Sequence, residues 1–146
     1  MADKFKLQTV LNHRQRIESL AQQKLADSLR HETATLHQLA NQRDDLNKLQ
    51  QELTGRQQTG IAVQELQLFC LSINRRRKDL QSLIEQSEKL HREVKSNRQL
   101  LTEAAQEKKL LENLKEKKEA EQKHQDNQRE SATLDDIALR LGKHSL

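Results

Sequence analysis

The strongest constraint on the fold is a glycine-bounded break in the middle of a chain that has no proline and only three glycines. Gly55 and Gly60 lie between two long stretches in which apolar residues recur at helical spacing. Glycine adopts positive φ at little steric cost, so it commonly follows the last residue of a helix. The sequence therefore predicts an all-α fold, an antiparallel two-helix coiled-coil hairpin with a C-terminal helical overhang. We expect a single domain, with helices over residues 3–54 and 61–141 and a turn over residues 55–60.

The composition is typical of long helices and argues against an enzyme. Charged residues make up 33% of the chain and only two residues are aromatic, as in coiled coils. A two-helix hairpin buries a narrow seam, and the sequence has no glycine-rich phosphate loop and no nucleophile beside a convergent base. The histidines are scattered without H-x-x-x-H spacing, so no metal site is expected. We therefore expect no catalytic activity and no cofactor.

The cysteine and hydropathy patterns bear on the compartment. The single cysteine, Cys70, cannot form an internal disulfide and suits a reducing cytosol. No segment approaches the roughly 20 apolar residues of a membrane-spanning helix. These features predict a cytoplasmic protein without direct membrane insertion.

The second predicted helix has the clearer heptad. Ten of its fourteen seam positions are apolar, which strongly indicates a coiled coil. The first helix is less regular, because its apolar series runs through Leu7, Ile17 and Ala21 and then takes two successive four-residue steps, to Leu25 and Leu29. Such a stutter unwinds a supercoil locally and predicts looser packing there. The seam positions of the second helix are Leu66, Phe69, Ile73, Arg76, Leu80, Leu83, Ser87, Leu90, Val94, Asn97, Leu101, Ala104, Lys108 and Leu111.

The position of the turn predicts which residues face each other. If the chain folds back midway between the two glycines, the numbers of facing residues sum to about 115, so Leu7 faces Lys108. Residues beyond Leu114 would then form the overhang. It is polar as far as residue 133, after which four apolar residues recur at i, i+3, i+4 and i+7: Leu134, Ile137, Ala138 and Leu141. This stripe indicates a docking helix, and a frayed tail with chance leucines is the alternative.

Both ends of the chain carry patterns similar to those of a known family. The N-terminal pattern is Phe5-x-Leu7-x-x-Val10-Leu11-x-x-Arg14-x-x-x-Glu18-x-x-Ala21, followed by Leu25-Ala26. The C-terminal pattern is Leu111-Glu112-x-Leu114-Lys115-Glu116-Lys117, then Arg129-Glu130, then Leu134-Asp135-Asp136-Ile137-Ala138. In this order they resemble the FliJ-type proteins of the bacterial flagellar type III export apparatus. Length and the mid-chain break also fit, so the resemblance covers essentially the whole chain.

The resemblance implies a non-enzymatic stalk, similar to that of rotary ATPases. It would link the hexameric flagellar export ATPase to the cytoplasmic domain of the export gate membrane protein, and some members also escort export chaperones. The protein would be cytoplasmic and peripheral at the cytoplasmic face of the inner membrane. The free helix ends would enter the ATPase, with candidate contacts at Phe5, Leu7, Arg14, Lys115, Lys117, Lys118, Arg129, Leu134, Ile137 and Leu141. The gate would contact the early second helix, with candidates Leu66, Phe69, Ile73 and Arg76, although the heptad places Phe69 and Ile73 in the seam.

Three other functions fit parts of the sequence. A stalk protein of a virulence-type secretion system is the nearest alternative, and a generic cytosolic coiled-coil scaffold would share the same periodicity. The basic run Arg75-Arg76-Arg77-Lys78 could neutralise phosphates in a nucleic-acid-binding arm. Aromatic residues for base stacking are almost absent, however, so we expect no nucleic-acid partner.

Overall fold

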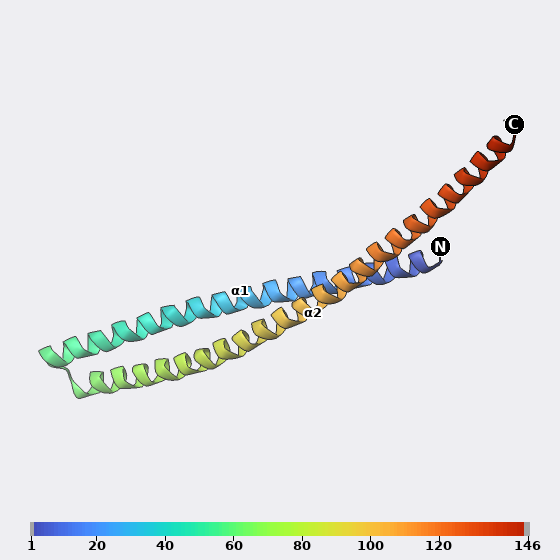
Figure 1. Cartoon of the computed structure of the whole chain (residues 1–146). Helices are drawn as coiled ribbons and strands as arrows, with labels where there is room; N and C mark the ends of the chain where they lie inside the picture. The colour runs from blue at the N-terminus through green and yellow to red at the C-terminus, as the bar shows by residue number, and fades with distance from the viewer. Residues whose placement is uncertain (1, 145–146) are drawn as a thin grey trace. The chain divides into compact units, whose positions relative to one another are not determined.

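The computed structural model describes residues 2–144, with side chains for residues 6–143, and consists of two long α-helices (Figure 1). Helix α1 spans Ala2–Thr59 and helix α2 spans Val63–His144. The helices pack against each other as the predicted all-α hairpin. The chain divides into two compact units, and each helix contributes to both. The terminal unit contains residues 1–18 and 103–146, and the hairpin unit contains residues 19–102.

The turn is shorter than predicted and lies later in the sequence. Helix α1 continues through Gly55 and ends at Thr59, and only residues 60–62 connect it to α2. Gly60 has a φ of 102°, whereas no other described residue has positive φ. Reversal of the chain therefore requires glycine at position 60 alone, and Gly55 is a tolerated helical glycine. The predicted turn over residues 55–60 is wrong for this reason. The second helix also extends past its predicted end at residue 141, through Gly142 to His144.

In the hairpin unit the two helices run side by side in opposite directions from the turn (Figure 1). The seam of α2 follows the predicted heptad, with Ile73, Leu83 and Val94 buried. The seam of α1 has no stutter, which corrects the predicted four-residue steps to Leu25 and Leu29, although Leu29 is itself half-buried beside the buried Ser28. Its buried and half-buried residues include a continuous alternation of three- and four-residue steps: Ala21, Leu25, Ser28, Glu32, Thr35, Leu39, Gln42, Leu46, Leu49 and Leu53.

In the terminal unit the beginning of α1 packs against α2, and the red end of α2 continues past it (Figure 1). Leu11 and Ala104 are the buried apolar residues of this seam. Lys115 is the last half-buried residue of α2, and every residue from 116 to 143 is exposed. Residues 116–143 are called the overhang below.

Ion pairs fix the register of the two helices within each unit. In the terminal unit Arg14 pairs with Glu107, and in the hairpin unit Arg56 pairs with Glu65 at 3.2 Å. The residue numbers of these two pairs sum to 121, and those of the Gln8–Lys115 and Glu18–Lys108 contacts sum to 123 and 126, rather than to the predicted value of about 115. The observed register is thus displaced by about one heptad, because the chain reverses at residues 60–62. A displacement of this size keeps the same face of α2 in the seam and changes which residues it meets.

Candidate interaction surfaces

Charged residues in the seam of the terminal unit are paired across the two helices. The Lys108 Nζ lies 3.3 Å from a carboxylate oxygen of Glu18 and 3.8 Å from one of Glu112. The side chains of Lys108 and Glu18 are 25% and 18% exposed, so both are partly removed from water. The Arg14–Glu107 pair is more exposed. The more exposed Arg14–Glu107 pair contributes little to stability, and the main effect of both pairs is to select the register.

Four of the predicted ATPase contacts, Leu7, Arg14, Lys115 and Lys118, lie at the open end of this seam. Leu7 is half-buried and lines a shallow hollow with Val10, Leu111 and Lys118. Lys115 donates a hydrogen bond to the Gln8 side-chain oxygen at 2.7 Å. Leu7, Lys115 and the paired Arg14 hold α1 against α2, whereas Lys118 remains exposed. A partner at this end would therefore meet an ordered pair of helices.

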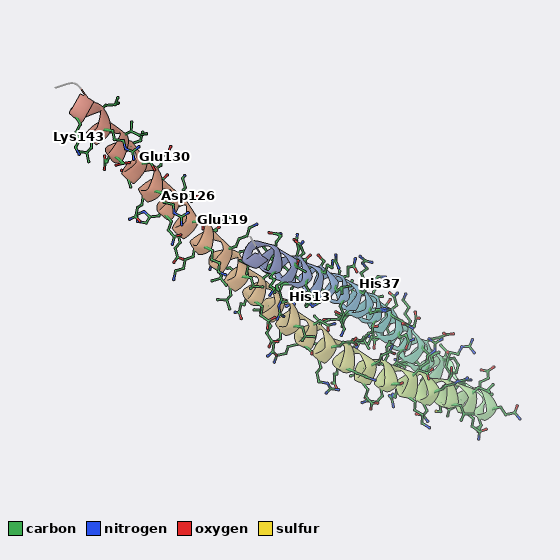
Figure 2. The ribbon with its side chains drawn as sticks, turned by 90° about the vertical axis from the view of Figure 1, so that its right-hand side faces the viewer. His13, His37, Glu119, Asp126, Glu130 and Lys143 are labelled. Atoms are coloured by element: carbon green, nitrogen blue, oxygen red, sulfur yellow. The ribbon has the colours of Figure 1, made fainter. Side chains whose placement is uncertain are left out.

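The overhang is a single helix that exposes its whole circumference. Figure 2 shows Glu119, Asp126, Glu130 and Lys143 along a part of α2 that has no second helix beside it. Its side-chain contacts are local, such as the Arg140–Asp136 ion pair at 3.4 Å. Leu134, Ile137 and Leu141 are 61%, 46% and 65% exposed. With the exposed Ala138, these three residues form the overhang stripe, an apolar surface without a partner in the described chain.

The start of α2 has two different apolar faces. On the inner face, Ile73 is 7% exposed, and Leu66 and Phe69 are half-buried. The guanidinium of Arg56 lies 5.6 Å from the centre of the Phe69 ring, in the range of a cation–π contact. On the outer face, Leu68 and Leu71 are each 67% exposed.

Polar side chains occupy the seam in the middle of the hairpin unit. Ser28, Thr35 and Asn97 are 4%, 7% and 3% exposed. The Ser28 hydroxyl donates to the Leu25 carbonyl at 2.9 Å, which satisfies it within its own helix. One Glu32 carboxylate oxygen lies 3.4 Å from the His91 ring, whereas its other oxygen and the Asn97 amide nitrogen are buried without a hydrogen-bond partner. This part of the seam is less favourable than an apolar one.

The family model described as the flagellar FliJ protein matches residues 3–146. The chain belongs to the flagellar FliJ protein family. This assignment makes the FliJ-family chain a component of flagellar protein export, and the family is structural rather than one of known enzymes. No curated protein and no solved structure matches the chain.

The structure of this FliJ-family chain divides its predicted contact residues into two groups. Exposed residues are available to a partner, and they are Lys117, Lys118, Arg129, Leu134, Ile137 and Leu141 on the overhang, with Arg76 near the turn. Residues engaged within the chain are Leu7, Arg14, Lys115, Leu66, Phe69 and Ile73. Arg76 lies 4.0 Å from Asp45 and remains half-exposed. The side chain of Phe5 lies outside the described residues.

Sequence reasoning missed two features of the FliJ-family chain. It left Leu68 and Leu71 outside the predicted seam but did not single them out as a second, exposed apolar face, although their offset of two positions from Leu66 and Phe69 indicates one. The sequence analysis also did not identify Ser28, Glu32 and Thr35 as seam positions of α1, because it followed the neighbouring leucines. A strict alternation of three- and four-residue steps, followed backward from Leu53, would have found these positions.

Among its described residues, the FliJ-family chain has neither a membrane-spanning helix nor a metal cluster. No stretch of either helix in this range is long and apolar enough to cross a membrane. No three residues among the described His, Cys, Asp and Glu side chains converge as a metal site would require. The exposed surfaces described above are therefore the features that a functional proposal must explain.

Proposed function

We propose that this FliJ-family chain is the stalk that links the hexameric flagellar export ATPase to the cytoplasmic domain of the export gate. One observation carries the proposal: the overhang stripe is apolar, exposed and without a partner in the described chain. A solvated single helix gains nothing from four apolar residues on one face, whereas an external surface would cover them. The family assignment supports export as the setting for that surface.

The charges around the overhang stripe suit a contact that holds and still allows movement. Lys117, Lys118 and Arg129 are exposed, and none forms an ion pair with a described residue. Exposed pairs with acidic residues of a ring-shaped ATPase would be weak and sensitive to salt. In this proposal the stripe anchors the stalk, and the basic residues orient it.

The other end of the stalk meets the export gate through the start of α2. Because Ile73 is buried, its role in this contact is to support Phe69 and Leu66 from within the seam. The half-exposed Arg76 and the half-buried Phe69 are the predicted residues left for the gate. The proposal places the protein at the cytoplasmic face of the inner membrane, with export chaperones as further partners.

Double substitution of Leu134→Ser and Leu141→Ser tests the ATPase contact. We expect the full chain to keep its melting curve, because both side chains are exposed, and to lose binding and stimulation of the ATPase. Leu139→Ser is the matched control, since Leu139 is 68% exposed and lies on the opposite side of the same helix. Deletion of residues 131–146 should reproduce the loss. If the double variant stimulates the ATPase as well as the unchanged chain, the overhang has no part in the contact.

A further inference from the structure

The outer face of α2 near the turn carries an apolar and basic stripe that the proposed stalk function does not use. Leu68, Leu71, Arg75 and Lys78 follow one another at steps of three, four and three, so they lie on one side of the helix. All four are exposed. They form the outward stripe, which is about 15 Å long at 1.5 Å per residue. It faces away from the seam residues Leu66, Phe69 and Ile73.

The turn and the start of α2 carry mostly basic side chains. Residues 55–80 contain five basic and two acidic residues, a difference of +3 within a chain whose net charge is +4. Arg56 and Arg76 lie within ion-pairing distance of Glu65 and Asp45. Arg75, Arg77 and Lys78 are exposed and form no ion pair with any described residue, although Arg75 lines a hollow that also contains Asp45 and Asp79. Val63, nearer the turn, adds a further apolar side chain that is 70% exposed.

We propose that the outward stripe docks the hairpin unit on an anionic lipid surface. Leucine side chains can enter the boundary between headgroups and acyl chains, while arginine and lysine extend to the phosphates. Basic residues beside a membrane are attracted to anionic lipids, by about fivefold in affinity for each charge. Docking of this kind leaves the helix at the surface and involves no spanning segment.

An acidic peptide is the main competing partner, and two observations disfavour it. The outward stripe lies on one face of one helix, which is convex and offers no pocket for a peptide side chain. The polar hollow beside it is lined by Asp45 and Asp79 as well as by Arg75 and Arg76, so an acidic side chain that entered this hollow would meet two carboxylates there. A flat anionic surface needs neither a pocket nor that hollow.

Co-flotation of the full chain with vesicles tests the proposal directly. We expect binding to phosphatidylcholine vesicles that contain phosphatidylglycerol, weakened by salt, and little binding to phosphatidylcholine alone. Arg75→Glu with Lys78→Glu should weaken binding by at least about 25-fold, from two contributions of about fivefold. Leu68→Ser with Leu71→Ser should weaken it by about tenfold or more, because two exposed leucines lose their apolar contact with the membrane.

The overhang provides matched controls with similarly exposed residues. Leu134→Ser with Leu141→Ser removes two leucines, and Lys117→Glu with Arg129→Glu reverses two basic charges, all outside the outward stripe. Neither control should change vesicle binding, and circular dichroism should show full helicity in every variant. Equal binding to both vesicle types, or equal losses in the controls, would overturn the proposal. Leucine-dependent binding to soluble polyglutamate without vesicle binding would assign the stripe to an acidic protein instead. The assay uses no ATPase or gate, so its result is independent of the stalk function.

Discussion

Replacing Asn97 by leucine should raise the free energy of unfolding of the hairpin unit by about 2–3 kcal/mol. Asn97 is 3% exposed, lies on the seam heptad of α2, and its amide nitrogen is buried without a hydrogen-bond partner. Leaving such a donor unsatisfied costs about 1–3 kcal/mol. Leucine removes that cost and, with nearly the same size, adds apolar contact worth up to about 1.5–3 kcal/mol when fully buried. The expected gain of about 2–3 kcal/mol is smaller than the sum of these two contributions, because the new side chain will pack imperfectly.

Urea unfolding followed by far-ultraviolet circular dichroism measures this change. For a chain of this size the gain corresponds to a rise of about 4–12 °C in melting temperature. Asn127→Leu is the matched control, because Asn127 is exposed in the overhang and the same substitution there should act within about 0.5 kcal/mol. Asn97→Ala removes the amide without filling its space and should stabilise less than leucine. Sedimentation should confirm an unchanged oligomeric state, since buried polar seam residues also restrict association.

The opposite result would refute the reasoning. If Asn97→Leu lowers the unfolding free energy with an unchanged denaturant slope and oligomeric state, the amide must be well hydrogen-bonded in solution. The polar seam around Ser28, Glu32 and Thr35 would then be a stabilising layer rather than a weak one. The exposed control separates this outcome from a general effect of added leucine.

Two further predictions test the seam and its register. Ile73→Ala should lower the unfolding free energy by about 2–4 kcal/mol because Ile73 is 7% exposed. Leu68→Ala should change the unfolding free energy by less than about 0.5 kcal/mol. Equal losses of unfolding free energy in urea melts would mean that Leu68 is covered. In a chain with Cys70 replaced by serine, cysteines at Gln8 and Lys115 should join through a short bismaleimide, whereas cysteines at Gln8 and Lys108, about 10 Å away along α2, should join poorly. The reverse yields on a denaturing gel would establish the register predicted from the sequence.

The fold could be predicted because the periodic signal in α2 is strong. Its seam positions are mostly apolar, and the structure buries or half-buries nearly all of them. In α1 the same alternation passes through Ser28, Glu32 and Thr35, while Leu29 and Leu36 lie one position away. An interpretation that follows apolar residues therefore leaves the seam at this point. Burial depends on which face the partner helix covers, and that choice is set by the whole seam rather than by one residue's hydrophobicity.

The contact surfaces could be predicted only as groups of residues. The overhang was located to within a few positions, because apolar seam residues stop near the end of the paired region and Lys115 is the last half-buried one. Near the turn, the predicted heptad places Ile73 in the seam and leaves Leu71 outside it, but the predicted gate contacts are all seam positions. Ile73 and Leu71 are only two positions apart, yet one is 7% exposed and the other 67%. Helical geometry makes this distinction once the seam is known.

The register could not be read from the heptads, because a pattern that repeats every seven residues fits equally well after a shift of one heptad. Charges remove this degeneracy. In the register that sums to 115, Glu18 would face Asn97 and Glu32 would face Leu83, so both carboxylates would lie away from Lys108 and His91. In the observed register Glu18 lies 3.3 Å from the Lys108 Nζ and Glu32 lies 3.4 Å from the His91 ring. Partly buried carboxylates are costly without partners, so electrostatic matching selects the observed register even though each pair adds little stability. The same choice sets how much of α2 remains unpaired, and hence the length of the overhang that carries the exposed stripe.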